Sequence, residues 1–142
     1  MNGPDDSAQR GNAVSGKKEN MNELVLSTLP KTWIFDLDGT LMKHNGYRTE
    51  EGDTLLPGAK EAIDAIPPED KIVILTSRTE EIREQTLAFL KDHAIRYDEI
   101  LFGMPMGERI VVNDRKPSGI DMAFAVNLDR NQFALPKVRR EL

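Results

Sequence analysis

The chain has 142 residues, a net charge of −5 and no cysteine, which predicts one compact domain without disulfides or thiolate chemistry. The acidic balance argues against an electrostatic grip on nucleic acid or on an anionic membrane. Every apolar run is strand-sized and the N-terminus lacks a signal-like apolar core, so we expect a cytoplasmic protein with no membrane span.

The first 20 residues are polar and contain almost no large apolar side chains. Such a segment cannot offset its ordering entropy by burial, so residues 1–20 are predicted to form a disordered tail. The remaining residues, 21–142, are predicted to form a single domain.

Three strong runs of β-branched and aromatic residues predict strands, and each run stops at a polar residue. They are 32–35 before Asp36, 71–75 before Thr76, and 110–112 before Asn113 and Asp114. Weaker runs at 100–102 and 123–126 predict two further strands. The strong runs are nearly all apolar rather than alternating, which is typical of strands covered on both faces.

Helical patterns lie between these strands. One runs from Pro57 to Ile66, and a second runs over 79–92 with Ser77 and Glu80 at capping-box spacing. A short helix is expected after Pro117. Alternating strands and helices predict an α/β fold with a doubly wound, Rossmann-like parallel sheet and helices on both faces. Ligands of such sheets bind at the carboxyl ends of the strands.

The segment Asp36-Leu37-Asp38-Gly39-Thr40 is the strongest candidate for chemistry. Two carboxylates two residues apart at the end of a strand can face one site, and a divalent cation relieves their repulsion. One carboxylate could attack phosphorus while the other protonates the leaving oxygen. The same pattern, taken alone, also occurs in ordinary loops and in calcium-type turns.

This segment resembles the first motif of the haloacid dehalogenase superfamily. Thr76 and the pair Asn113-Asp114 stand at the places of its second and fourth motifs, in the same order. The resemblance covers about residues 32–128. It implies a Mg²⁺-dependent phosphatase in which Asp36 forms an aspartyl-phosphate and binds the metal, and Asp38 is the acid and base.

The resemblance also implies roles for the other motif residues. Thr76 would hydrogen-bond the transferred phosphoryl group, and Asp114 would join Asp36 and the backbone of Asp38 as a magnesium ligand. Further candidates for substrate binding are Gly39, His44, Ser77, Arg78 and Asn113.

A lysine that usually balances the phosphoryl charge is missing. In small capless members related to capsule-biosynthesis phosphatases it stands in Gly-Lys-Pro, whereas this chain has Gly103-Met104-Pro105. Methionine carries no charge, so Lys116 is the best predicted substitute. Arg78 and Arg109 are weaker candidates, for which a salt bridge or a solvated position is the default.

The spacing of the motifs leaves no room for a cap domain. Residues 41–56, which we call the flap, can hold only a hairpin or a loop beside the site. An open site needs a large substrate or a neighbouring subunit as its lid. We therefore expect a homo-oligomer with the flap near the entrance of the site.

Three functions are consistent with the sequence. The first is a phosphatase of a small phosphorylated metabolite, a sugar phosphate of surface-polysaccharide synthesis, with no nucleic acid or membrane partner. The second is a phosphatase of a macromolecule, either a phosphoprotein or a nucleic-acid end. The third is a non-catalytic binding or regulatory module weakened by Met104 and Asn113.

Overall fold

The computed structural model describes residues 23–141, so the predicted tail of residues 1–20 lies outside the described residues. These residues form two compact units. The larger unit comprises Leu29–Met106 and Asp129–Ala134. The smaller unit comprises the described residues up to Thr28, Gly107–Leu128, and the described residues from Leu135 onward.

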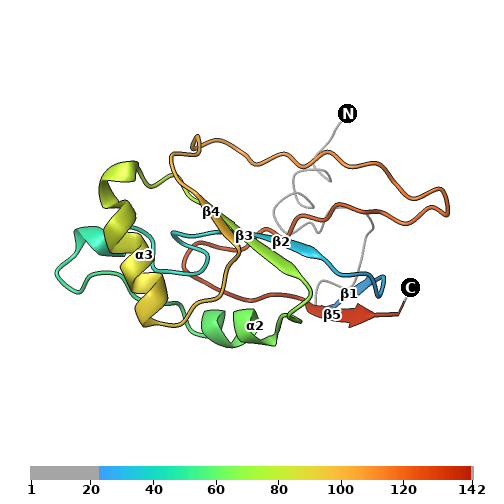
Figure 1. Ribbon diagram of the computed structural model, residues 1–142, viewed down its shortest axis with the longest axis horizontal. Helices are drawn as coiled ribbons and strands as arrows, with labels where there is room; N and C mark the ends of the chain where they lie inside the picture. Colours follow the sequence, from blue (N-terminus) through green and yellow to red (C-terminus); the bar gives the residue numbers. More distant parts are fainter. Residues whose placement is uncertain (1–22, 142) are drawn as a thin grey trace. The chain divides into compact units, whose positions relative to one another are not determined.

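The larger unit is built on an open, parallel, three-stranded sheet. Its strands are β2 (Thr32–Asp36), β3 (Lys71–Leu75) and β4 (Glu99–Leu101), in the spatial order β2-β3-β4 (Figure 1). The register pairs Asp36 with Leu75, and Leu75 with Leu101. The carboxyl ends of the strands therefore share one edge, and the strands predicted for this unit are confirmed within one residue.

The helices of the larger unit follow the predicted order. The 3-10 helix η1 (Gly46–Arg48) lies in the flap and is followed by α2 (Ala59–Ala65). A 3-10 turn η2 (Glu80–Ile82) leads into α3 (Arg83–Asp92). The predicted capping box is wrong, because Thr79 is the N-cap and the Ser77 hydroxyl donates to the Pro105 carbonyl instead.

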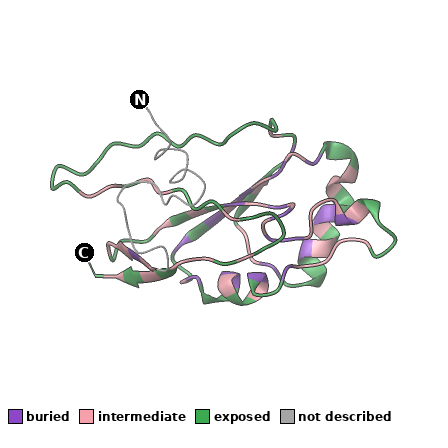
Figure 2. Ribbon diagram, turned by 180° about the vertical axis from the view of Figure 1, so that it is seen from behind, coloured by how far each residue is buried: buried purple, intermediate pink, exposed green. Residues whose placement is uncertain are grey.

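The core of the larger unit joins the sheet to its helices. Ile72 and Ile74 of β3, Ile63 of α2 and Leu90 of α3 have no exposed surface, and buried residues gather along these elements in Figure 2. Strand β2 is less covered than predicted, because Ile34 keeps 50% of its surface exposed. A strand at the edge of a sheet has fewer neighbours to bury it than a central strand.

The smaller unit contains a parallel pair of strands that the sequence did not predict. Strand β1 (Glu23–Leu26) pairs with β5 (Lys137–Arg140), with Glu23 opposite Lys137. Charged residues dominate β5, so its apolar pattern is too weak to indicate a strand. The pairing joins the two ends of the described chain.

Three predictions for residues 107–128 are wrong. No regular strand forms at 110–112 or 123–126, and the expected helix after Pro117 is a turn closed by Gly119 N–H donating to the Lys116 carbonyl at 2.7 Å. Ile110 and Val112 are 83% and 90% exposed. An apolar run forms a strand only when a neighbour satisfies its backbone groups, and no such ladder is found for 110–112.

The described residues therefore form an α/β protein with parallel strands in open sheets. They contain two α-helices and five strands, so the doubly wound arrangement stays a prediction. None of the described helices has the length and apolar composition that crossing a membrane requires.

Candidate active site

The turn after β2 presents the two predicted carboxylates. Leu37 is fully buried and its carbonyl accepts the N–H groups of Leu41 and Met42 at 3.0 Å, which folds the chain back on itself. Asp36 and Asp38, on either side of Leu37, are both partly exposed. Because Leu37 anchors the turn in the core, both carboxylates are held at the carboxyl end of the sheet.

Gly39 is required in this turn for two reasons. Its φ of +86° lies in the left-handed region, which a side chain disfavours. A Cβ at this position would also lie 3.3 Å from Cγ of Arg130. Asn131 donates its backbone N–H to the Gly39 carbonyl at 2.8 Å, and the backbone N–H of His44 donates to the Asn131 side chain at 2.7 Å. Segment 129–134 thus packs against the turn, a contact that the sequence did not indicate.

Thr76 stands at the same edge of the sheet as Asp36. It directly follows Leu75, the register partner of Asp36, and it is buried. Its Oγ1 accepts the backbone N–H of Arg78 at 3.1 Å, which leaves the hydroxyl hydrogen to be donated elsewhere. The Met104 N–H donates to the Thr76 carbonyl at 3.0 Å. The methionine is therefore at this edge, where the resemblance expects a lysine.

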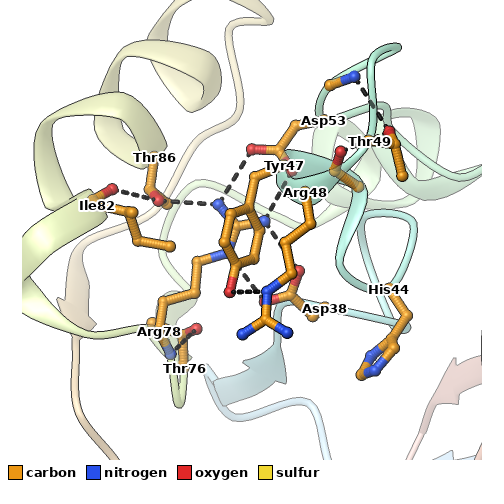
Figure 3. Close-up of polar contacts among 12 residues, drawn as sticks. Asp38, His44, Tyr47, Arg48, Thr49, Asp53, Thr76, Arg78, Ile82 and Thr86 are labelled. Carbon is orange, nitrogen blue, oxygen red and sulfur yellow. Dashed lines mark hydrogen bonds and ion pairs between the residues drawn. The ribbon is translucent and has the colours of Figure 1, made fainter.

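Arg78 forms the centre of the site. Its Nε and Nη2 donate to the two carboxylate oxygens of Asp38 at 2.9 and 2.8 Å, and its Nη1 and Nη2 donate to those of Asp53 at 3.0 and 2.8 Å. Nη1 also donates to Oγ1 of Thr86 at 2.9 Å, and the ring of Tyr47 lies 4.6 Å from the guanidinium carbon (Figure 3). Every N–H of the guanidinium is therefore used.

The electrostatics of Arg78 follow from this arrangement. Burial on its own lowers the pKa of Arg78, but the hydrogen bonds and charges of Asp38 and Asp53 outweigh it and raise the pKa above its ordinary value. The side chain stays a cation whose charge is shared between two carboxylates. While this network stands, no N–H of Arg78 is left for the predicted contact with substrate.

Asp53 is the residue of this site that sequence reasoning missed. It lies in the flap, 25 residues before Arg78, and no spacing rule connects the two. Tyr47 also lies in the flap, which the spacing of the motifs predicts near the entrance of the site. His44, also in the flap, makes its interaction with segment 129–134 through its backbone, and in Figure 3 its ring lies apart from the Arg78 cluster.

The donors of the turn suit magnesium. Mg²⁺ in proteins is held by one or two carboxylates together with water and substrate phosphate. Both oxygens of Asp38 are engaged by Arg78, and Oδ2 of Asp36 accepts the hydroxyl of Thr40 at 3.2 Å. Magnesium binding by Asp36 and by the backbone of Asp38 stays a prediction. Residues 23–141 contain no cluster of three or more potential metal-ligating side chains.

The predicted residues of the fourth motif belong to the smaller unit. The side-chain amide of Asn113 donates to the Asp114 carbonyl at 3.2 Å, and Lys116 begins the turn that ends at Gly119. All of Asn113, Asp114 and Lys116 are exposed. Metal binding by Asp114 and phosphoryl binding by Asn113 or Lys116 stay predictions.

Comparison with known proteins gives two structural neighbours. No protein-family model and no curated protein matches the chain. A chain in the Pnkp1/Rnl/Hen1 complex is 32% identical over 58% of this chain, with a TM-score of 0.46. A chain in the Pnkp1/Rnl/Hen1 RNA repair complex is 34% identical over 54%, with a TM-score of 0.45. The protein spans 31% and 27% of the length of these chains.

These neighbours contradict the predicted partners. A small sugar phosphate with nucleic acid excluded was expected, whereas both similar chains come from complexes of RNA repair components. The exclusion rested on the net charge of −5, which is an average over the whole chain and does not report the charge at one site. The prediction of a small sugar-phosphate partner with nucleic acid excluded is therefore wrong, and the homo-oligomer stays a prediction.

Proposed function

We propose that this protein is a phosphomonoester hydrolase of the haloacid dehalogenase type. The observation that carries the proposal is the placement of Asp36, Asp38 and Thr76 at the carboxyl ends of the adjacent strands β2 and β3, at one edge of the parallel sheet. Asp36 is the nucleophile in this mechanism. Thr76 donates its hydroxyl hydrogen to a phosphoryl oxygen, and Asp38 transfers protons.

The reaction proceeds in two displacements at phosphorus. In the first, a carboxylate oxygen of Asp36 forms a bond to phosphorus, the ester P–O bond breaks, and Asp38 protonates the leaving oxygen. In the second, water attacks the aspartyl-phosphate, Asp38 takes a proton from that water, and the phosphate–Asp36 bond breaks. A bound Mg²⁺ would supply positive charge to the phosphoryl oxygens.

The open site favours a macromolecular substrate. Between Asp36 and Thr76 the only helical elements are η1 and α2, and residues 77–106 hold only η2, α3 and β4. Neither interval contains a cap that could exclude water, so a large substrate must cover the site itself. A phosphorylated nucleic-acid end is the first such substrate to test, since the similar chains belong to RNA repair complexes.

A second candidate function is a non-catalytic phosphate-binding or regulatory module. Met104 supplies no charge at the edge of the sheet, and the N–H groups of Arg78 are all engaged. Electrostatic stabilisation of the transferred phosphoryl group is a large part of catalysis. A domain without a nearby cation could therefore bind phosphate and turn it over slowly or not at all.

Phosphate release separates these functions. The substrates are oligonucleotides with a 5′- or 3′-phosphate, a phosphopeptide and p-nitrophenyl phosphate, each with Mg²⁺ or EDTA. We expect Mg²⁺-dependent release that is lost in Asp36→Asn and kept in Asp64→Asn, a control whose carboxylate makes an exposed ion pair with Lys60. Release that survives Asp36→Asn would overturn the proposed nucleophile, and no release from any compound would favour the binding module.

A further inference from the structure

A buried arginine side chain links the flap to the acid–base carboxylate. Arg78 contacts Asp53 and Tyr47 of the flap on one side and Asp38 of the turn on the other (Figure 3). Thr86 fixes the same guanidinium from α3, and its hydroxyl in turn donates to the Ile82 carbonyl at 2.7 Å. Three separate elements thus determine the position of one guanidinium.

Burial distinguishes the two carboxylates that share this cation. The side chain of Arg78 is 1% exposed and that of Asp53 is 3% exposed, whereas that of Asp38 is 17% exposed. A buried carboxylate is stable only when it is paired. Asp53 therefore has a structural need for Arg78, while Asp38 is the partner that reaches the surface where a substrate arrives.

The pairing geometry fixes the orientation of Asp38. A bidentate arginine–carboxylate pair aligns the two planar groups, so rotation of the guanidinium turns the carboxylate with it. Asp53 uses the Nη1 and Nη2 edge, and Asp38 uses the Nε and Nη2 edge. Without Asp53, the outer end of Arg78 would keep Thr86, the Tyr47 ring and Asp38 itself as its restraints.

We propose that Asp53 is a positioning residue for general acid catalysis by Asp38, acting through Arg78. The position of the flap against Arg78 therefore sets the efficiency of proton transfer. This inference rests on the proposed function. Asp53 contacts neither the reacting phosphorus nor the leaving group in this scheme. It holds the plane of Arg78, and Arg78 donates to both oxygens of Asp38, one of which must carry the proton that goes to the departing alkoxide.

If Asp38 acts as the acid, the rate of phosphoryl transfer depends on the leaving group. An alkoxide departs only when it is protonated, whereas p-nitrophenolate is stable enough to leave without a proton. A misplaced acid therefore slows transfer from an alkyl ester more than transfer from the aryl ester. Loss of fold or loss of the nucleophile would slow both esters equally.

The experiment compares kcat/KM for two substrates in three variants. The substrates are p-nitrophenyl phosphate and the best phosphorylated oligonucleotide, which is an alkyl ester. Asp53→Asn keeps the size of the side chain and removes its charge. Glu51→Gln makes the same change two residues earlier in the flap, at an exposed pair with Lys43. Tyr47→Leu removes the ring from Arg78 and leaves every carboxylate in place.

We expect Asp53→Asn to lower kcat/KM about 30-fold or more for the oligonucleotide and less than about threefold for the aryl ester, which is part of the roughly 10²–10⁴-fold that general acid catalysis supplies. Tyr47→Leu shifts the ratio in the same direction by a smaller factor, and it serves as the test if Asp53→Asn does not fold. Glu51→Gln leaves the ratio unchanged.

Equal losses on both esters in Tyr47→Leu and in a folded Asp53→Asn would overturn the positioning role while leaving the proposed function intact. A wild-type protein inactive on both esters would overturn the proposed function first, and the positioning role with it.

Discussion

Strand β3 and segment 110–112 are both short β-branched runs, yet only one forms a strand. Strand β3 pairs with β2 on one side and β4 on the other, and its alternate residues Ile72 and Ile74 are fully buried. Segment 110–112 has no regular ladder in the structure, and Ile110 and Val112 are largely exposed. The difference shows that an apolar run can form a strand, but that it does so only where neighbouring strands pair with it.

The largest effect on activity is expected at the end of β2, a strand that the sequence predicts and the structure contains. Asp36→Asn removes the nucleophile at the end of β2 and should lower kcat about 10⁴-fold or more. Circular dichroism and the melting temperature should be close to wild type, since Asp36 is partly exposed. Initial rates with the best oligonucleotide measure the effect, and a loss below about tenfold would show that the turn is not catalytic.

One substitution in β3 and one in segment 110–112 test this difference in burial directly. Ile74→Ala removes a fully buried side chain of β3 and should lower the free energy of unfolding by about 2–5 kcal/mol. Val112→Ala removes apolar atoms from a residue that is 90% exposed and should change the free energy of unfolding by less than about 0.5 kcal/mol. Urea unfolding followed by far-ultraviolet circular dichroism measures both. A large loss in Val112→Ala would show that segment 110–112 is buried in solution.

A substitution in the smaller unit tests whether its predicted metal ligand is used. If Asp114 is a magnesium ligand, as the resemblance implies, Asp114→Asn raises the Mg²⁺ concentration for half-maximal activity about 10–100-fold. The control is Asp121→Asn, which breaks an ion pair with Arg115 within the same segment. Magnesium titration of activity distinguishes them. Identical curves for Asp114→Asn and wild type would limit the site to the larger unit.

The smallest expected effect concerns the missing cation. Met104→Lys adds an amine at a residue whose backbone N–H donates to the Thr76 carbonyl at 3.0 Å. It should raise kcat/KM about tenfold by adding positive charge near the phosphoryl group. Met104→Gln has a similar length without the charge and serves as the control. A lysine variant no faster than the glutamine variant would mean that another group already supplies the charge.

The sequence was sufficient to predict the elements whose partners are local in the βαβ pattern. Strands β2, β3 and β4 and helices α2 and α3 followed from apolar periodicity and from polar residues at strand ends, and the same reasoning placed Asp36 and Thr76 at one edge. Residues with distant partners could not be found this way. The contact of Asp53 with Arg78 is such a case, because composition and spacing say nothing about which loop folds over which strand.

The pairing of β1 with β5 has a consequence for how the chain folds during synthesis. Glu23 is among the first described residues to emerge from the ribosome, and its partner Lys137 is among the last. At typical elongation rates β1 therefore waits on the order of ten seconds for its partner. The larger unit needs only segment 129–134 from the late part of the chain, so its sheet can form while β1 is still unpaired. A nascent chain halted before residue 137 would expose the edge of β1 to other chains, which makes truncated products the species most prone to aggregate.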